Sequence, residues 1–537
     1  MTPIAPRKRA PSIVLASLVA FVAAPISATS TAAATVNGFV TQVNSPADFC
    51  VGSLHVVLNG KTQCETQGLR SEIGLKRKGF FHQYFLLQNR PIPKSEAAVP
   101  CNALSLRVGS RVQVTGDRGP QHDPIAAAHL IVYKVDIQRK FSTSWKPAPW
   151  TGGALLEEEP QLRRTAKGWA GTLWLDGYPM RIAPDTQLLP WIGSFLSWRA
   201  DHLYDGSIVA SPPPASAFPA SLFQPNTWAT YQGSRHADGT ILLDRIGLSP
   251  NQPYSGCEKI STSLTPIIHL PNYASDAPGS AVFPEGGLVR SKALTILPGR
   301  NLQDYVSRLG ASLIPRYQEA MPETIATKVH FRFYVVKSRW ATFDDLVSNV
   351  YSLPYMAGPN WDDAVLALPN GMIFVPTSTL TEVGSNAQLA TILSSAIASV
   401  LQGQSCTAWH ETQGSGAGCF CPIANGMSWA AFAYGFVLWR DEQALRIGIR
   451  QMYLAGYDIR EAPFAWALAE GKSAANPVTD APASSAEIPW YTAYAFHYIS
   501  QFYSDVDYSK LKRGRAEYAQ FLKELRQADT EAFGPKQ

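Results

Sequence analysis

Short runs of alternating apolar and polar residues fill the first half of the chain. One series starts at residues 38–43 and a second at residues 168–174. Each contains a strand, a turn, a second strand, an irregular insertion, a strand that ends in glycine and a final strand. Repeated short strands with glycine turns are typical of small closed barrels. The pattern therefore predicts two OB-like β-barrels, over residues 36–136 and 168–250.

Two stretches outside these strands have a different composition. Residues 142–159 are rich in Pro, Trp and Glu, and residues 271–286 are dense in Pro, Ala, Ser and Gly. Such segments interrupt regular secondary structure. We expect them to be linkers between domains.

From about residue 297 the pattern changes to alternating helices and strands. Apolar residues at helical spacing predict an amphipathic helix over residues 301–313, and alternation predicts a strand at residues 330–336. Residues 364–375 predict two short strands around the turn Pro369-Asn370-Gly371. A helix over residues 386–401 follows, in which Ala and Ser separate the apolar positions. Small residues on the other faces of the helix indicate that neighbouring elements pack closely against most of its surface.

The first 34 residues have the features of a secretory signal peptide. Three basic residues, Arg7 to Arg9, precede an apolar run over residues 13–24 and a series of small residues that a peptidase could cleave. The apolar run is shorter than the roughly 20 residues that a membrane-spanning helix needs. We therefore expect an exported protein, periplasmic or extracellular and of bacterial type, with no integral membrane segment after cleavage.

The overall composition and charge exclude several classes of protein. The chain of 537 residues is 46% hydrophobic and only 16% charged, which excludes a disordered or fibrous protein. Its 46 Lys and Arg face 41 Asp and Glu, and removal of the leader leaves 43 against 41, a net charge of +2. This near-balance argues against nucleic acid as a partner.

The seven cysteines have two interpretations in an exported protein. Cys50 and Cys64 flank one hairpin-like segment and are disulfide candidates, as are Cys406, Cys419 and Cys421 in a Gly-rich loop. Alternatively, three thiolates and an imidazole could bind zinc. That set is Cys406, His410, Cys419 and Cys421, whose spacing is not one of the common structural-zinc patterns. We favour disulfides over metal.

Three segments of the second half resemble the M48 family of zinc metallopeptidases. Residues 363–375 are similar to the strand segment that precedes the family's active-site helix. Residues 386–401 resemble the helix that carries its H-E-x-x-H motif, and residues 441–448 resemble its later E-x-E-A-D-x-x-G segment. The resemblance covers about residues 297–530 and implies a gluzincin-like α+β domain.

The residues that carry the chemistry of the family are substituted in this chain. In the family, two histidines one helical turn apart bind zinc and the Glu beside the first acts as general base. Those positions are Ser395, Ala396 and Ser399 here, and the third ligand position is Asp441. A lone carboxylate does not retain zinc. The resemblance therefore implies no catalytic residues and no metal cofactor at this place.

Three functional hypotheses follow. The first is an exported pseudopeptidase that retains binding of a peptide or protein along a sheet edge. The second is a hydrolase with a displaced site near Cys406–Cys421, where His410 and Glu411 lie. The third is a carbohydrate- or cell-envelope-binding protein that acts through its β-domains. This hypothesis is suggested by four tryptophans: Trp145, Trp150, Trp169 and Trp174. Tryptophans on strands are, however, more often core residues than ligand-binding residues.

Overall fold

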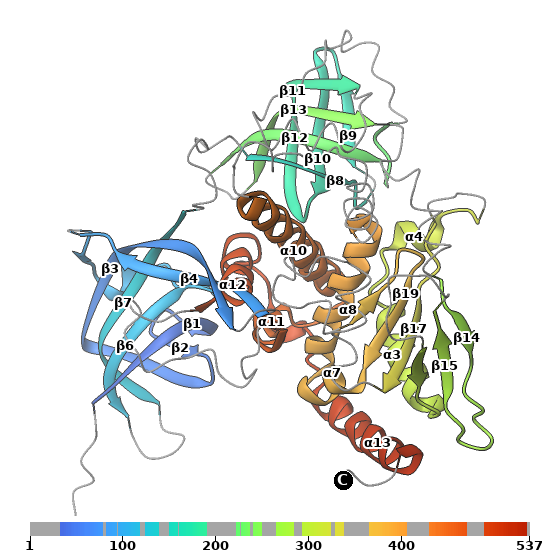
Figure 1. Ribbon diagram of the computed structural model, residues 1–537. Coiled ribbons are helices and arrows are strands. Elements are labelled where there is room, and N and C mark those ends of the chain that lie inside the picture. Colours follow the sequence, from blue (N-terminus) through green and yellow to red (C-terminus); the bar gives the residue numbers. More distant parts are fainter. Residues whose placement is uncertain are drawn as a thin grey trace, which may run out of the picture.

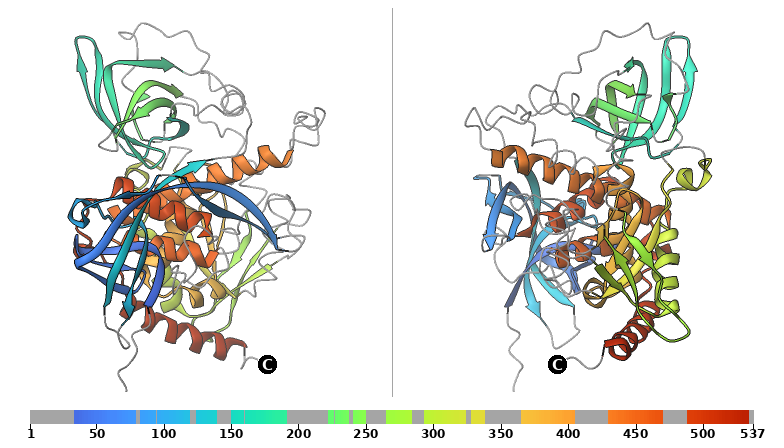
Figure 2. Two further views of the ribbon diagram at one scale, coloured as in Figure 1. Left: turned by 90° about the vertical axis from the view of Figure 1, so that its left-hand side faces the viewer. Right: turned by 45° about the vertical axis from the view of Figure 1, so that its right-hand side comes forward.

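Three β-sheets lie on different sides of a group of central helices (Figure 1 and Figure 2). The protein is multidomain and rich in β-structure, with a helical C-terminal region. The leader predicted over residues 1–34 lies outside the described residues except for its last two. The computed structural model describes residues 33–78, 82–93, 95–118, 124–138, 150–158, 160–190, 222–225, 227–236, 240–249, 265–283, 293–323, 328–337, 365–404, 429–469 and 488–533.

The first sheet contains a small closed barrel. Strand β2 pairs with both β1 and β3, β3 runs parallel to β7, and β6 closes the circle between β7 and β1. Apolar side chains of these strands, among them Phe49, Val56 and Leu130, fill the interior. The five strands are β1 (Ala33–Ser45), β2 (Asp48–Val51), β3 (Leu54–Lys78), β6 (Arg111–Arg118) and β7 (Ile125–Gln138).

Strand β3 continues beyond the barrel and connects it, through β4, to the helical C-terminal region. Its second half pairs with β4 (His82–Pro91), and β4 pairs with the short strand β20 (Ile488–Pro489). A further short strand, β5 (Ala97–Ala98), also pairs with β3. The first sheet therefore includes a short strand from the helical C-terminal region, directly before α12.

The second sheet has the same strand order as the first barrel. Strands β8, β10, β11, β13 and β12 take the places of β1, β2, β3, β7 and β6, and β11 runs parallel to β13. A bridge between Leu156 and Leu175 joins the two ends of this series, and β9 pairs outside β10. The strands are β8 (Trp150–Leu155), β9 (Gln161–Thr165), β10 (Gly168–Leu175), β11 (Tyr178–Pro190), β12 (Trp228–Arg235) and β13 (Ile241–Ser249).

A shared irregularity strengthens this equivalence. In both sheets the register of the parallel pair shifts at one point, and a threonine hydroxyl lies at the shift. Thr62 donates to the Ala127 carbonyl at 2.7 Å, and Thr186 donates to the Leu243 carbonyl at 2.8 Å. Both hydroxyls also accept a backbone N–H three residues earlier in the chain. The same local hydrogen bonds thus shape the third strand of both sheets.

The third sheet begins earlier in the chain than the sequence suggested. Strand β15 lies within residues 271–286, where a linker was expected, and β8 likewise begins within residues 142–159. In the third sheet β17 runs parallel to β19, with the order β14-β15-β16-β17-β19-β18. Its strands are β14 (Ile267–His269), β15 (Gly279–Val282), β16 (Ala293–Ile296), β17 (Arg332–Lys337), β18 (Leu366–Ala367) and β19 (Met372–Pro376).

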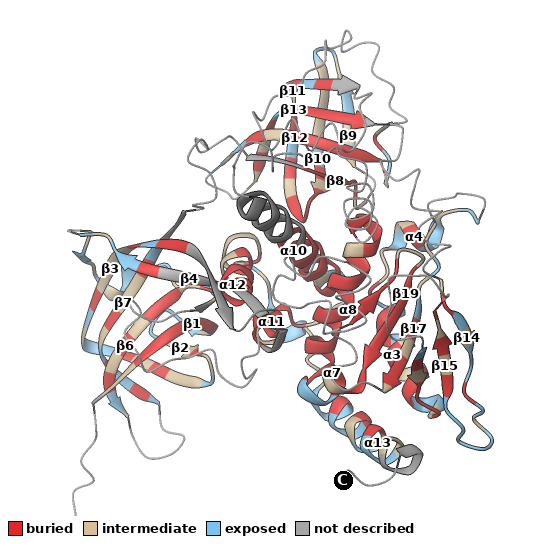
Figure 3. Cartoon of the chain, in the orientation of Figure 1, coloured by how far each residue is buried: buried red, intermediate tan, exposed pale blue. Residues whose placement is uncertain are grey.

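The central helices pack against all three sheets. Helix α8 spans Asn386–Leu401, as the sequence predicted, and packs along α10 (Trp429–Leu454). Figure 3 shows both as buried over most of their described side chains. Within the described residues, no helix combines the length and apolar character needed to cross a membrane. The others are α3 (Arg300–Ala311), α4 (Arg316–Ala320), α7 (Thr377–Glu382), α11 (Ala462–Ala469), α12 (Trp490–Phe502) and α13 (Arg515–Phe533).

Candidate functional site

Helix α8 carries three of the four peptidase-like positions. The Ser385 hydroxyl caps its N-terminus by accepting the backbone N–H of Gln388 at 3.1 Å, which satisfies one of the free donors there. Ser395 and Ala396 are 4% and 7% exposed, and Ser399 is half-buried. These positions therefore lie on a helix that is packed into the core.

Ser395 lies against α10 at a glycine. A Cβ added at Gly448 would lie 2.7 Å from Ser395 Oγ and 3.0 Å from the Ser395 backbone nitrogen, which is closer than packed atoms tolerate. Ser395 Oγ is itself buried and has no hydrogen-bond partner in the described part of the chain. An imidazole at position 395 would require the two helices to separate.

Asp441, the fourth position, lies on α10 and is 7% exposed. Its Oδ2 accepts a hydrogen bond from the Tyr491 hydroxyl of α12 at 2.7 Å. Leu445, one helical turn further on, is fully buried at the position where the M48 family has an Asp. The carboxylate at position 441 is therefore bound within the contact between α10 and α12.

The four positions do not fit a zinc ion. Zinc sites in proteins use three or four His, Cys or carboxylate ligands. Ser395 and Ser399 offer neutral hydroxyls, Ala396 offers a methyl group, and Asp441 offers one carboxylate that already accepts a hydrogen bond. No step of metal chemistry can be assigned to this set.

The second predicted site lies outside the described residues. This applies to Cys406, His410, Glu411, Cys419 and Cys421. Within the described residues, no group of three or more His, Cys, Asp and Glu side chains is arranged to hold a metal ion. The displaced-site hypothesis therefore stays a prediction from the sequence.

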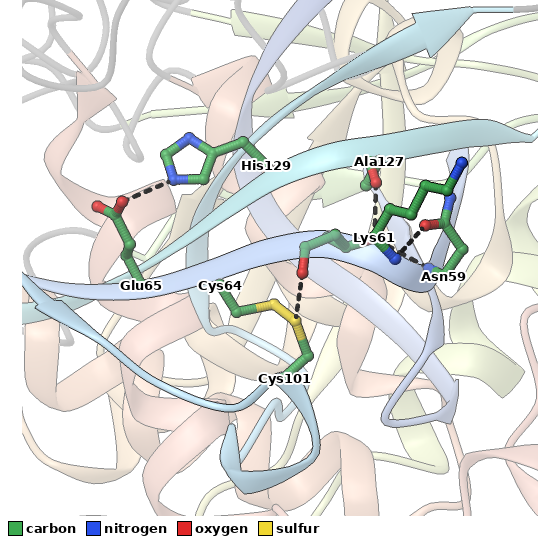
Figure 4. The surroundings of a disulfide bond; sticks show 8 residues. Asn59, Lys61, Cys64, Glu65, Cys101, Ala127 and His129 are labelled. Atoms are coloured by element: carbon green, nitrogen blue, oxygen red, sulfur yellow. Dashed lines mark hydrogen bonds and ion pairs between the residues drawn. A yellow bond between two sulfur atoms is a disulfide. The ribbon is translucent and has the colours of Figure 1, made fainter.

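The first barrel contains a disulfide bond. Cys64 of β3 is bonded to Cys101 (Figure 4). Cys50 is a free, half-buried thiol. Burial raises the pKa of the Cys50 thiol, and Asp48 adds to this effect. Of the two disulfide candidates in this barrel, only Cys64 forms a bond. Its partner, Cys101, was not among the disulfide candidates from the sequence.

A buried polar cluster joins the second sheet to α10. We call strands β8, β10, β11, β13 and β12 of this sheet the second barrel. Asp176 and Gly177 form the tight turn between β10 and β11, with φ of 59° and 74°. The Asp176 carboxylate accepts from Arg446, from Gln443 at 3.0 Å and from the Tyr231 hydroxyl at 2.7 Å. The side chains of Asp176 and Arg446 are 2% and 3% exposed. The turn therefore inserts into the helical core.

Tyrosines surround the Arg446 guanidinium in this cluster. Arg446 donates to the Tyr494 hydroxyl at 2.7 Å and lies 4.6 Å from the centre of the Tyr178 ring. Tyr178 and Tyr494 share a hydrogen bond at 3.1 Å, and the Tyr498 hydroxyl donates to the Gly177 carbonyl. Burial raises the pKa of Tyr178 well above its ordinary value. The tyrosine side chains of the cluster are therefore neutral, and their hydrogen bonds position the second sheet against the helices.

A buried acid lies beside this cluster. The Glu157 carboxylate accepts the backbone N–H of Gly177 at 2.6 Å and lies 3.5 Å from Arg450 Nε. Arg450 also contacts Glu158 at 2.7 Å, and its guanidinium lies 3.5 Å from the centre of the Trp174 ring. Burial raises the pKa of Glu157 to about 7, against the opposing effect of Arg450. Glu157 and Arg450 line a cavity of about 1380 Å³.

The sequence predicted only part of the cluster around Asp176 and Glu157. Asp176-Gly177 between two alternating segments predicts a hairpin turn, but nothing in the local pattern indicates that the turn is buried. Glu157 lies within residues 142–159, where a linker was expected. Its role depends on Arg450, almost 300 residues away, so no local spacing could reveal it.

The three segments that resemble the M48 family lie close to one another in the fold. They fall on β18 and β19, on α8 and on α10, and α8 packs on both α10 and β18. Comparison of the chain with protein-family models and with curated proteins finds no match.

Proposed function

We propose that this protein is an exported, catalytically inactive relative of the M48 metallopeptidases, with a gluzincin-like C-terminal domain behind two OB-like barrels. The observation that carries the proposal is the packing of Ser395 against Gly448. Active members need two imidazoles and a carboxylate on this face of the helix. Small residues fill that place here, and removal of charged ligands from a buried site also removes their desolvation cost.

The arrangement of the second barrel supports a scaffold role for the β-domains. OB-type barrels bind ligands through the face of their second and third strands and the loops beside it. In the second barrel, the turn between those strands is buried against α10 at Asp176. One end of these two strands therefore contacts α10, as expected for a barrel that serves as scaffold.

The tryptophans give little support to carbohydrate binding. Trp169 packs on Phe223 with ring centres 5.8 Å apart, and Trp174 packs under Arg450. Trp145 lies outside the described residues, as does the side chain of Trp150. The two described tryptophans thus have packing partners within the protein, as core aromatics do.

Export is supported by the Cys64–Cys101 disulfide. Disulfides persist in oxidising compartments and are rare in the cytosol. The predicted leader agrees with this inference. We therefore assign the chain to the periplasm or the extracellular space as part of the proposal.

Peptide binding is the activity that this fold would retain without zinc. An extended peptide can add a strand to an exposed sheet edge, using backbone hydrogen bonds that need no catalytic residue. Within the described residues, β14 is the edge strand of the third sheet with exposed side chains, and Ile267 is 63% exposed there. This edge is the place where we expect a bound peptide.

The test is a cleavage assay of the full chain on an unstructured protein substrate, with added zinc and with a chelator. The proposal predicts no cleavage above background in either condition. Chelator-sensitive cleavage that is lost in Asp441→Asn would overturn it. Cleavage that survives Asp441→Asn but is lost in His410→Ala would instead establish the displaced site.

A further inference from the structure

The hairpin of β9 and β10 extends further than its counterpart in the first barrel. Counted back from the start of β3 and of β11, the Ser45–Asp48 pair of the first barrel corresponds to the Gln161–Thr172 pair of the second sheet. The hairpin of the first barrel ends at that pair. In the second sheet the pairing continues for four more residue pairs. Residues 162–171 therefore form an extension that the first barrel lacks.

One edge of this extension is open. Strand β9 is the last strand of the second sheet, and no strand of the described part of the chain pairs with its outer side. In an edge strand, alternate residues direct their backbone N–H and C=O groups away from the sheet. These groups form a row of donors and acceptors that matches the backbone of another extended chain.

The open edge is strongly basic. Residues 161–167 contain three basic residues, Arg163, Arg164 and Lys167, and no acidic one, and all three are exposed. The paired strand β10 has no charged residue that could neutralise them. Within the described residues, neither Arg163 nor Lys167 takes part in an ion pair. A partner with negative charge therefore complements this edge.

Positive charge flanks the edge on both of its faces. Arg163 and Arg164 are successive residues of β9, and successive side chains of a strand point to opposite faces. A strand added beside β9 can place a carboxylate opposite an arginine on either face. Cross-strand pairs of opposite charge stabilise a sheet.

The open backbone groups favour a polypeptide over other polyanions. An extended peptide supplies both N–H donors and C=O acceptors at the spacing of the edge, whereas phosphate and sulfate groups supply acceptors only. The charge of this edge also distinguishes it from the β14 edge, where the exposed side chains include Ile267. The two edges should therefore select different peptides.

We propose that the β9 edge binds an acidic, extended segment of a partner protein, which adds to the second sheet as a further strand. The carboxylates of that segment face Arg163, Arg164 and Lys167. The proposal rests on the second sheet alone, so it depends neither on the loss of catalysis nor on peptide binding at β14.

Calorimetric titration of the full chain with three peptides, each acetylated and amidated, tests this proposal. The probe is Glu-Val-Glu-Val-Glu. One control, Gln-Val-Gln-Val-Gln, keeps the strand-forming pattern and loses the charge. The other control, Glu-Pro-Glu-Pro-Glu, keeps the charge and loses two backbone donors. We expect the probe to bind about tenfold more tightly than either control.

Three outcomes would overturn the proposal. Equal binding of the probe and the glutamine peptide would show that the basic residues do not select the partner. Equal binding of the probe and the proline peptide would show that charge alone attracts them, without strand addition. No binding at millimolar concentration would leave the basic residues with the role of keeping sheet edges apart.

Two double variants locate the binding. Arg163→Gln with Lys167→Gln removes two positive charges from the edge, and Lys512→Gln with Lys523→Gln removes two from exposed positions near and on α13. The first should weaken binding of the probe severalfold, and the second should leave it unchanged. Thermal unfolding establishes that both variants are folded. Equal affinities of the two variants would show that the β9 edge is not the site.

Discussion

Ser395 of α8 and Gly448 of α10 are in such close contact that a single added methyl group at Gly448 would come within 2.7 Å of the Ser395 hydroxyl. Under the proposed relationship to the metallopeptidases, this contact lies where active members carry a zinc-binding imidazole. Two serines, Ser394 and Ser395, lie beside Gly448 here and bring no charge to the contact. Close packing of small residues therefore holds the two helices together at this point.

Gly448→Ala is expected to destabilise the protein by about 1–3 kcal/mol, because the added methyl group overpacks the contact between α8 and α10. The measurement is the free energy of unfolding in urea. Ser395→Ala is the matched control and should change stability little, because it deletes a hydroxyl without a hydrogen-bond partner. If Gly448→Ala is as stable as the native chain, the helices are not in close contact.

Arg446→Met is expected to cost about 3–5 kcal/mol, because it leaves the Asp176 carboxylate buried without its cation. Urea unfolding again measures the loss. Asp176→Asn in the same chain should restore part of it, since asparagine is neutral and tolerates the positive φ of this turn. An Arg446→Met chain that loses less than about 1 kcal/mol would show that the pair does not hold the barrel to α10.

Removal of the disulfide by Cys64→Ala and Cys101→Ala is expected to destabilise the protein by about 2–4 kcal/mol, because the bond closes a long loop of the unfolded chain. The two cysteines are 37 positions apart. Alkylation followed by peptide mass spectrometry checks the bond itself. Cys50 should be labelled in the unfolded chain without reductant, and Cys64 and Cys101 only with it. Labelling of Cys64 without reductant would contradict this pairing.

Glu157 is expected to make the stability of the protein depend on pH. Folding raises its pKa from 4.5 to about 7, so the folded state holds this proton more tightly than the unfolded state. The contribution to stability is full below pH 4.5 and is lost as the pH rises to 7, a change of about 3 kcal/mol.

The difference in unfolding free energy between the native chain and Glu157→Gln isolates this effect. Arg450, Glu158 and Asp176 face Glu157 and are present in both chains. The difference should fall as the pH rises between 4.5 and 7. A difference that stays constant over this interval means that Glu157 titrates normally.

Local sequence patterns predicted the elements that depend on local signals. Helix α8 begins at residue 386 and ends at residue 401 as expected, because Ser385 caps it and its apolar period is regular. The turn at Gly371 likewise lies between two short strands, β18 and β19. In both cases the signal and the structure it specifies lie within a few residues of each other.

Features that depend on distant residues were not predictable in this way. Strand β15 has a turn-like composition, and it forms because β14 and β16 pair with it on both sides. Cys64 has Cys50 nearer in sequence, but the long insertion after β3 brings Cys101 beside it. The cavity beside Glu157 likewise combines segments from five parts of the chain.

Calorimetric titration of zinc into the full chain and into Asp441→Asn measures whether the peptidase-like positions bind zinc. This variant removes the one carboxylate of the set and leaves every cysteine and histidine in place. The account predicts the same number of bound zinc ions and the same affinities in both proteins. Loss of one equivalent of tightly bound zinc in Asp441→Asn would contradict it.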